Sequence, residues 1–419
     1  MKYVVPCLLG LEGPIRDELV RLGMKDVVSE NGRVFFSGGF EDLVKANVCL
    51  RIGERVLLEI GSFDAVTFDE LFERTKALPW EDYIPEDGAF PVKGYSLNSA
   101  LFSVSDCQKI IKKAVVERLK TKYRTDWFRE TGALYQIQFS IMKDRVSLCI
   151  DSSGAGLHKR GYRPAHNVAP LKETMAAALV TLSRYRGRED FCDPFCGSGT
   201  IPIEAALIAR NMAPGLNRSF SCENWPQIPS GIGRLVREEA RSREYHGSYS
   251  ILGSDLDPEA VMIARENAER AGVADIVRFE VADALQFERK TQNGIIVTNP
   301  PYGERILEKQ QAEELYRGFG RAWSASENWK LYLLSSHTEF ERTFGREADK
   351  KRKLYNGMIK CDLFMFLSEV SHVPSFCSEP PGRRRKESRR SRRNGRELFQ
   401  RQGRDIRNLP HHGSYGCRA

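Results

Sequence analysis

Long apolar segments are missing from this chain of 419 residues. No run approaches the roughly 18 consecutive apolar residues that a membrane-spanning helix requires. The apolar start, Met1–Gly10, is short, and Glu12, Asp17 and Glu18 follow it at once. This pattern is typical of a first strand and helix and argues against a secretory signal peptide. We therefore expect a cytoplasmic protein.

Paired metal ligands and paired cysteines are also missing. The ten cysteines include no Cys-x-x-Cys pair, and the seven histidines form no cluster. Cys192 and Cys196 are separated by three residues, and no second pair lies nearby. We expect reduced thiols, no disulfide framework and no metal site.

The glycine motifs of two common nucleotide-binding folds are missing as well. No G-x-G-x-x-G sequence and no Gly-Lys-Ser/Thr sequence follows the predicted strand 190–195, which argues against NAD and against a P-loop nucleotide. In their place stands the shorter turn Cys196–Thr200, with Gly197 and Gly199, leading into a predicted helix 201–211. A glycine turn between a strand and a helix directs backbone N–H groups at a ligand. The sequence therefore predicts a different ligand at this turn.

The body of the chain carries almost no net charge, and the net positive charge of the protein is concentrated near its C-terminus. Residues 383–419 hold thirteen Lys and Arg against three Asp and Glu, a net charge of +10, which leaves residues 1–382 at about −2. The segment 380–419 is rich in arginine and poor in apolar residues, so it cannot form a core. We expect a basic, disordered tail.

The order of predicted elements divides the rest of the chain. Short strands and helices alternate over residues 1–63, which predicts a small α+β domain of ferredoxin-like type. Residues 64–155 predict a second α+β unit, with a helix capped by Thr67 and a hairpin at its end. From 171 to 372 the regular β–α alternation predicts an α/β domain, a doubly wound sheet with mixed edge strands.

Three segments allow two interpretations each. Residues 151–163 form either an interdomain linker, continuing over 156–170, or a basic and aromatic strip beside a nucleic-acid path. Residues 216–247 interrupt the β–α alternation and either cover a cofactor or pack as an embellishment. The lysines of the predicted helix 106–122 favour a solvated face over an RNA-facing surface.

Acidic residues stand at the ends of three successive predicted strands of the α/β domain. They are Asp193, Asp255 and Asp283. Ligands bind at the carboxyl ends of the strands of such a sheet. A carboxylate at 255 can accept two hydrogen bonds from ribose hydroxyls, and one at 283 can accept a hydrogen bond from an adenine amino group.

The sequence Asn299-Pro300-Pro301-Tyr302 follows the buried strand predicted over 294–298. Neither proline can donate to a sheet ladder, so the chain leaves the sheet at Asn299. The amide oxygen of Asn299 and the carbonyl oxygen of Pro300 suit the two hydrogens of a planar –NH₂ group. Tyr302 offers an aromatic face on which a base can stack.

These motifs together resemble the class I, AdoMet-dependent RNA methyltransferases that carry a THUMP domain, and above all the bacterial 23S rRNA guanine-N2 enzymes. The resemblance covers about residues 1–370. It rests on the following segments: DPFCGSGTIPIEAA from Asp193, GSDLDPEAV from Gly253, ADA around Asp283, NPPYGERI from Asn299, APLKETMAAAL from Ala169 and SSGAGLHKRGYR from Ser152. It implies that residues 64–155 are a THUMP RNA-binding domain and that residues 171–372 are a Rossmann-like methyltransferase domain.

The resemblance also implies a role for each motif residue. The methionine end of S-adenosyl-L-methionine (AdoMet) would be bordered by Asp193, Cys196, Gly197, Gly199, Thr200, Lys172 and Thr174. Asp255 would hold the ribose and Asp283 the adenine. Asn299, Pro300 and Tyr302 would hold the flipped target base, with Asn299 also next to the cofactor.

The activity that the resemblance implies is methylation of the N2 amino group of a guanine in 23S rRNA, without a metal or a covalent intermediate. Three alternatives stay open: a tRNA guanine-N2 enzyme, a DNA adenine-N6 methyltransferase and a non-catalytic RNA-binding assembly factor. The intact glycine turn, the acidic strand ends and the Asn299 motif argue against the last. The modified nucleotide and the oligomeric state cannot be read from the sequence.

Overall fold

The structure, a computed structural model, describes residues 1–163, 171–288, 291–301, 309–324, 329–357 and 359–367. The predicted basic tail, the second half of the predicted linker and Tyr302 lie outside these residues. In the described part of the chain, no helix combines the length and the apolar character that crossing a membrane would require.

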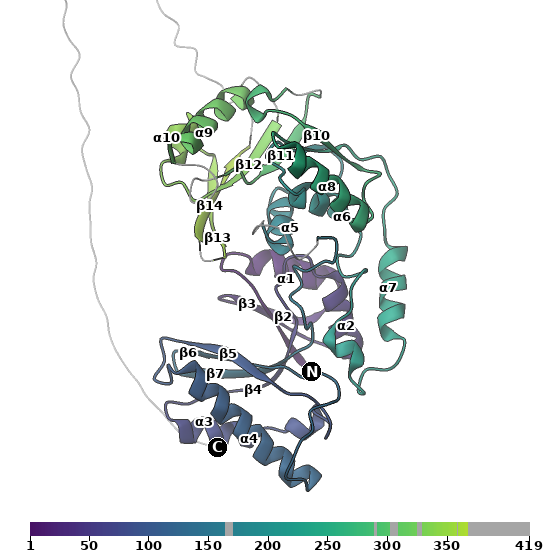
Figure 1. Ribbon diagram of the computed structural model, residues 1–419, viewed down its shortest axis with the longest axis vertical. Helices are drawn as coiled ribbons and strands as arrows, with labels where there is room; N and C mark the ends of the chain where they lie inside the picture. The colour runs from purple at the N-terminus through teal and green to yellow at the C-terminus, as the bar shows by residue number, and fades with distance from the viewer. Residues whose placement is uncertain (164–170, 289–290, 302–308, 325–328, 358, 368–419) are drawn as a thin grey trace, which may run out of the picture. The chain divides into compact units, whose positions relative to one another are not determined.

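The first half of the chain builds one sheet of seven strands. Its strand order is β2-β3-β1-β4-β7-β6-β5, so the regions predicted as separate domains share a continuous sheet through the β4–β7 pair. Figure 1 shows helices α3 and α4 lying together beside strands β5–β7. The elements of this half are β1 (Lys2–Pro6), α1 (Glu12–Arg21), β2 (Lys25–Glu30), β3 (Arg33–Ser37), α2 (Phe40–Cys49), β4 (Leu57–Asp64), α3 (Phe68–Lys76), η1 (Trp80–Asp82), β5 (Val92–Leu97), α4 (Val104–Tyr123), β6 (Ile137–Met142) and β7 (Arg145–Asp151).

The second half builds another seven-stranded sheet, with the order β10-β9-β8-β11-β12-β14-β13. Strands β10, β9, β8, β11 and β12 run parallel, and β14 and β13 add an antiparallel edge. This is the predicted doubly wound sheet with mixed edge strands. The elements of this half are α5 (Glu173–Leu182), β8 (Asp190–Asp193), α6 (Thr200–Ala209), η2 (Ser221–Asn224), α7 (Ile232–Ser242), β9 (Ile251–Asp255), α8 (Pro258–Ala271), β10 (Val277–Val281), η3 (Ala284–Gln286), β11 (Gly294–Thr298), α9 (Lys309–Ser324), β12 (Trp329–Ser335), α10 (Phe340–Phe344), β13 (Lys350–Asn356) and β14 (Ile359–Phe366).

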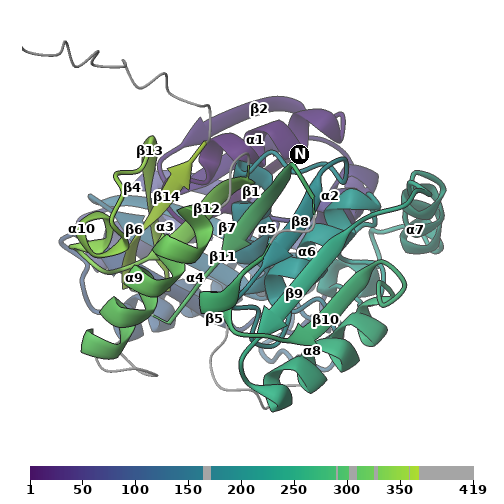
Figure 2. The ribbon, with the colours of Figure 1, turned by 90° about the horizontal axis from the view of Figure 1, so that it is seen from above.

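Strand β11 shows why helices cover both faces of the second sheet. Successive side chains of a strand point to opposite faces. Ile295 and Val297 join the core that includes α5, α6 and α8, whereas Ile296 joins a separate core with α9 and α10. Figure 2 shows these two sets of helices on either side of the strands. A strand that is apolar at every position is therefore buried on both sides, as a parallel strand requires.

The sequence missed one edge strand and misplaced another. Strand β2 was not predicted, because its sequence KDVVSE lacks a clear apolar alternation and five of its six residues are exposed. The sequence pattern predicts the last two strands of the sheet over 355–360 and 363–367, whereas in the structure β13 is Lys350–Asn356 and β14 is Ile359–Phe366. The chain reverses between them near Gly357, whose φ of 65° is left-handed. Lysine-rich β13 is an exposed edge, where charged residues replace the usual pattern.

Candidate active site

Three of the predicted site residues, Asp193, Asp255 and Asn299, lie at the carboxyl edge of the second sheet. Strand β8 ends at Asp193 and β9 at Asp255, and their parallel pairing puts both ends on one edge. Strand β11, on the other side of β8, ends at Thr298, directly before Asn299. The chain passes from β8 to β9 and β10 in one direction and then crosses back to β11. The edge between β8 and β11 is therefore the switch point at which such sheets bind ligands.

The glycine turn joins β8 to α6 and has the backbone that only glycine adopts easily. Gly197 and Gly199 have φ values of 50° and 81°. A Cβ on Gly199 would lie 2.9 Å from both the Ala264 Cβ and the Phe279 ring, so this position also requires a residue without a side chain. The Gly197 N–H donates to Asp255 Oδ2 at 2.8 Å, which ties the turn to the neighbouring strand end.

Cys196 within this turn is buried, and burial raises the pKa of its thiol well above the usual range. A thiol in this state is not a nucleophile, because the thiolate is the reactive form. The side chain therefore contributes shape to the turn rather than covalent chemistry.

The two acidic strand ends beyond β8 are held in place by backbone donors. Asp255 accepts from Gly197 and, at Oδ1, from the Asp257 N–H at 3.1 Å. Asp257 caps α8 by accepting from the Glu259 N–H at 2.9 Å. Asp283 accepts from the Leu285 N–H at 2.9 Å and caps a short 3-10 helix. Both half-buried carboxylates keep acceptor capacity for the hydroxyl or amino groups of a ligand.

Asp193 is the most enclosed of the three acidic residues. Its Oδ1 accepts from the Thr298 hydroxyl at 2.6 Å and from the Phe195 N–H at 3.1 Å. The side chain is only 1% exposed. The pKa of this carboxyl is raised to about 7, chiefly by burial and also by the nearby Asp255 charge, although the hydrogen bonds from Thr298 and Phe195 oppose the rise.

Lys172 and Thr174, at the start of α5, contact a residue of the N-terminal region. Both donate to the Glu54 carboxylate, at 3.2 Å from Lys172 Nζ and at 3.1 Å from Thr174 Oγ1. Arg163 lies beside them and binds Glu173, while its Nη1 also donates to the Thr200 hydroxyl at 3.1 Å. The segment that the resemblance assigns to the methionine end is thus fixed by Arg163, the last residue of the SSGAGLHKRGYR segment, and by Glu54, which lies in none of the quoted motifs.

Asn299 carries the one unusual polar atom of the site. Its Oδ1 is enclosed, and it has no hydrogen-bond partner in the part of the chain that the structure describes. Buried acceptors are normally satisfied, so an enclosed free acceptor is typical of a ligand site. Pro300 is buried, and the carbonyl of Pro301 accepts from the Tyr316 hydroxyl at 2.9 Å. Tyr302, the predicted stacking residue, lies outside the described residues.

The connector 151–163 is not a basic surface strip. Arg160 is buried and pairs with the fully buried Glu204 of α6, which also accepts from the Tyr162 hydroxyl at 3.2 Å. Arg163 is engaged as described above, and Lys159 alone of the basic side chains is exposed. Arg160 and Arg163 therefore do not form a basic surface beside a nucleic-acid path. They pair with the buried carboxylates of Glu204 and Glu173, because a buried charge needs a partner of opposite charge.

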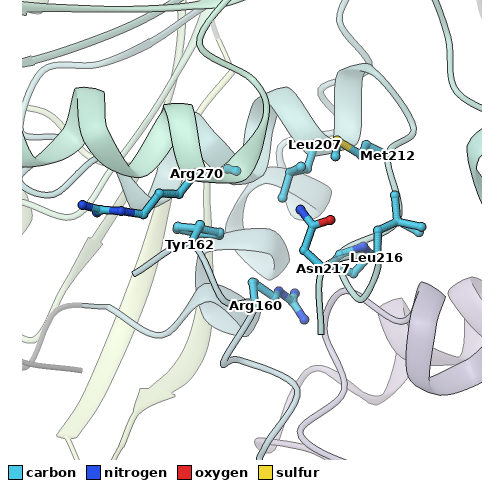
Figure 3. A pocket seen from close by; sticks show the side chains of 10 residues that line it. Arg160, Tyr162, Leu207, Met212, Leu216, Asn217 and Arg270 are labelled. Atoms are coloured by element: carbon cyan, nitrogen blue, oxygen red, sulfur yellow. The ribbon is translucent and has the colours of Figure 1, made fainter. Parts of the chain in front are cut away.

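A small pocket lies near this connector and away from the site (Figure 3). Arg160, Tyr162, Leu207, Met212 and Arg270 are among its lining residues. Leu207 and Arg270 belong to the C-terminal ends of α6 and α8, whereas the carboxyl edge of the sheet adjoins the N-terminal ends of these helices. We therefore do not assign the pocket to the active site. Within the described residues, no group of three or more His, Cys, Asp or Glu could hold a metal ion.

Three protein families match consecutive parts of the chain. The RlmL ferredoxin-like domain matches residues 2–57, the THUMP domain matches residues 65–151, and the RMKL-like methyltransferase domain matches residues 160–364.

Curated relatives cover most of this chain. The protein named "Putative RNA methyltransferase YpsC" of Bacillus subtilis is 46% identical over 365 residues, which cover 86% of this chain and 94% of that protein. The ribosomal RNA large subunit methyltransferase K/L of Psychromonas ingrahamii is 32% identical over 375 residues, 87% of this chain but 50% of that protein. The chain thus spans about half the length of the K/L relatives that it matches.

Solved structures of similar proteins agree with these family matches. A Listeria monocytogenes protein described as a predicted N6-adenine-specific DNA methylase has a TM-score of 0.82 and 47% identity, covering 87% of this chain and 95% of its own. The methyltransferase SMU.472, solved as a complex with SAH, has a TM-score of 0.83 and 40% identity, covering 88% and 98%. The chain belongs to the family of AdoMet-dependent RNA methyltransferases with a THUMP domain and an RMKL-like catalytic domain.

Proposed function

We propose that this protein transfers the methyl group of AdoMet to the N2 amino group of a guanine in 23S rRNA, in the cytoplasm. The observation that carries the proposal is the enclosed, unpaired Oδ1 of Asn299 beside the carboxyl end of β8. The free amide oxygen can accept a hydrogen bond from an amino group, whereas a hydroxyl nucleophile would need a general base, and a neutral amide is too weak a base for that role.

The names of the relatives favour ribosomal RNA as the acceptor, and the choice of guanine rests on the resemblance of the motifs to guanine-N2 enzymes. The K/L proteins, which are 32% identical to this chain over about half of their own length, are named for the large-subunit ribosomal RNA. The THUMP match supports RNA over DNA, although the Listeria relative is described as a DNA adenine methylase. Both adenine N6 and guanine N2 are exocyclic amino groups, so the Asn299 motif serves either.

The residues at the carboxyl edge fit AdoMet by their chemistry. Bound AdoMet supplies a methyl group on a sulfonium, which is electrophilic without activation. Asp255 and Asp283, oriented by backbone donors, offer acceptors for a ribose and an adenine. The buried carboxylate of Asp193 offers a counter-charge to a cationic methionine end, and the Gly197–Gly199 turn lets the chain approach closely.

The catalytic contribution of the protein is mainly orientation. Asn299 Oδ1 and the Pro300 carbonyl would accept the two hydrogens of the amino group and align its nitrogen with the methyl group. Accepting both hydrogens draws the nitrogen towards tetrahedral geometry and raises its nucleophilicity. The target base must leave its stack to reach this edge of the sheet.

Substitution of Asn299 tests the proposal. We expect Asn299→Ala to bind AdoMet within about twofold of the wild type but to lose about 100-fold or more in turnover, because a group that acts on the acceptor stabilises only the reacting state. Asn299→Asp, which keeps an acceptor oxygen, is the matched control and should retain measurable turnover. Calorimetry gives the AdoMet affinity, and methyl transfer to rRNA, tRNA and DNA gives the turnover. Near wild-type turnover of Asn299→Ala would refute the assigned role.

A further inference from the structure

One buried hydrogen bond joins the two halves of the candidate active site. The Thr298 hydroxyl donates to Asp193 Oδ1 at 2.6 Å, and the two side chains are 0% and 1% exposed. The residues are 105 positions apart in the chain and become neighbours because β8 and β11 pair in parallel, with Ile296 opposite Cys192. The contact therefore exists only in the folded sheet.

In the proposed function, the two residues that share this hydrogen bond lie on the sides of two different substrates, AdoMet and the target base. Asp193 precedes the glycine turn and lies on the cofactor side. Thr298 is the last residue of β11 and is bonded through the chain to Asn299, on the acceptor side. This hydrogen bond therefore links a residue on the cofactor side of the proposed site to the residue before Asn299 on the acceptor side.

Asn299 is held between two anchors. Thr298 fixes the chain before it, and the Tyr316 hydroxyl fixes the carbonyl of Pro301 after it, at 2.9 Å. Tyr316 is itself buried in α9, with its hydroxyl 3.2 Å from the Ser335 hydroxyl. Pro300 and Pro301 restrict the backbone between the anchors. The placement of Asn299 therefore depends on these two hydroxyl groups.

We propose that Thr298 is a positioning residue that couples the cofactor side of the site to Asn299 through Asp193. The proposal rests on the proposed function only in that a methyl group is transferred from AdoMet at this edge. Thr298 orients the Asp193 carboxylate for the cofactor and, by the same hydrogen bond, fixes the strand end that carries Asn299. Tyr316 acts on the acceptor side alone.

The two anchors can be separated by paired substitutions. Thr298→Val keeps the shape of the side chain and removes the hydroxyl. We expect it to weaken AdoMet binding about tenfold, the loss expected for one hydrogen bond to a charged group, and to slow single-turnover transfer at saturating AdoMet about tenfold or more. Thr298→Ser, which keeps the hydroxyl, should restore both quantities. Tyr316→Phe is the matched control and should slow transfer while leaving AdoMet affinity unchanged.

A double-mutant cycle tests whether Thr298 acts through Asn299. In the Asn299→Ala background, Thr298→Val should still weaken AdoMet binding but should slow the residual transfer less than in the wild type. Thermal unfolding of each variant shows whether it is folded. If Thr298→Val does not fold, the proposed role of the Thr298 hydroxyl is tested by comparing Thr298→Ser with Tyr316→Phe. Reduced AdoMet affinity and reduced transfer in Thr298→Ser would overturn that role.

Other outcomes also contradict the coupling. An unchanged AdoMet affinity in Thr298→Val would confine Thr298 to the acceptor side, and an unchanged transfer rate would confine it to the cofactor side. Either result overturns the proposal. If the modified base proves not to be a guanine, the product differs, but the expected AdoMet affinities and transfer rates of the variants stay the same. A failure of the proposed guanine specificity can therefore be distinguished from a failure of the proposed coupling through Thr298.

Discussion

At the scale of single residues, the charge of Asp193 depends strongly on its surroundings. It is enclosed, and burial raises its carboxyl pKa to about 7, against an ordinary value of 3.8. Because the folded protein holds this proton more tightly than the unfolded chain does, the contribution of Asp193 to stability is full below about pH 4. It is lost as the pH rises through about 7.

The same carboxyl makes AdoMet binding depend on pH. If the carboxylate form of Asp193 faces the cationic end of the cofactor, affinity should be constant above about pH 7 and fall about tenfold per pH unit below it. Asp255 is the charged group that opposes its ionisation, and the adjacent Cys192 and Cys196 thiols stay protonated because burial raises their pKa values. Calorimetric titration from about pH 5.5 to 8.5 checks this.

The control for this titration is Asp193→Asn, which cannot ionise. Its AdoMet affinity should be weaker than that of the wild type at pH 8 and should lack the slope below pH 7. A wild-type affinity that stays flat through this range would remove Asp193 from the cofactor site.

Local sequence identified the residues that carry motifs and missed those that depend on tertiary contacts. The acidic strand ends, the glycine turn and Asn299 could be predicted, because each follows a strand with a recognisable pattern. Thr298, Glu54 and Tyr316 could not be predicted, and the quoted connector segment contains Arg163 but does not reveal its contacts with Glu173 and Thr200. The partners of Thr298 and Glu54 lie more than 100 positions away, and a threonine at the end of a strand looks like an ordinary β-branched core residue.

At the scale of elements, the segment between α6 and α7 fastens the catalytic domain to the THUMP region. The Trp225 ring stacks on Tyr135, with ring centres 5.1 Å apart and planes 14° apart, and its Nε1–H donates to the Leu134 carbonyl at 2.9 Å. Gln227 adds a hydrogen bond to the Tyr83 carbonyl at 2.8 Å. Helix α7 packs on α2. These contacts favour the interpretation of residues 216–247 as a packing element over that of a cofactor lid.

Removal of the Trp225 side chain should therefore be costly. Trp225 is 3% exposed, and truncation of a buried tryptophan to alanine costs about 3–5 kcal/mol. Trp225→Phe keeps an aromatic ring and loses one hydrogen bond, so about 1–2 kcal/mol is expected. Urea unfolding measures both values. A loss below about 1 kcal/mol for Trp225→Ala would show that this segment does not fasten the two regions.

Strands with strong apolar patterns could be predicted to the residue, and edge strands could not. The predicted bounds of β3, β10 and β11 match the structure. Strands β2 and β13 lie at sheet edges and carry exposed, charged residues, so burial leaves no pattern in their sequences. The turn at Lys143 and Asp144, both with positive φ, confirms the predicted hairpin between β6 and β7.

At the scale of the whole molecule, the described residues link the THUMP region to the active site by several buried contacts. The sheet continues from the ferredoxin-like region into the THUMP region through β4 and β7. Glu54 joins the ferredoxin-like region to α5, and Trp225 joins the catalytic domain to the THUMP region. We infer that an RNA held by the THUMP region must present its target base at a set distance. These links could not be predicted, because each joins segments that are distant in the sequence.

The identity of the methylated nucleoside tests the central claim most directly. Purified protein and AdoMet would be incubated with 23S rRNA, tRNA and DNA from cells lacking this protein, and the digested nucleosides analysed by mass spectrometry. We expect N2-methylguanosine to form in 23S rRNA with the wild type and with Asn299→Asp, and not with Asn299→Ala. N6-methyladenine in DNA as the main product, or no methylated nucleoside in any of the three, would contradict the account.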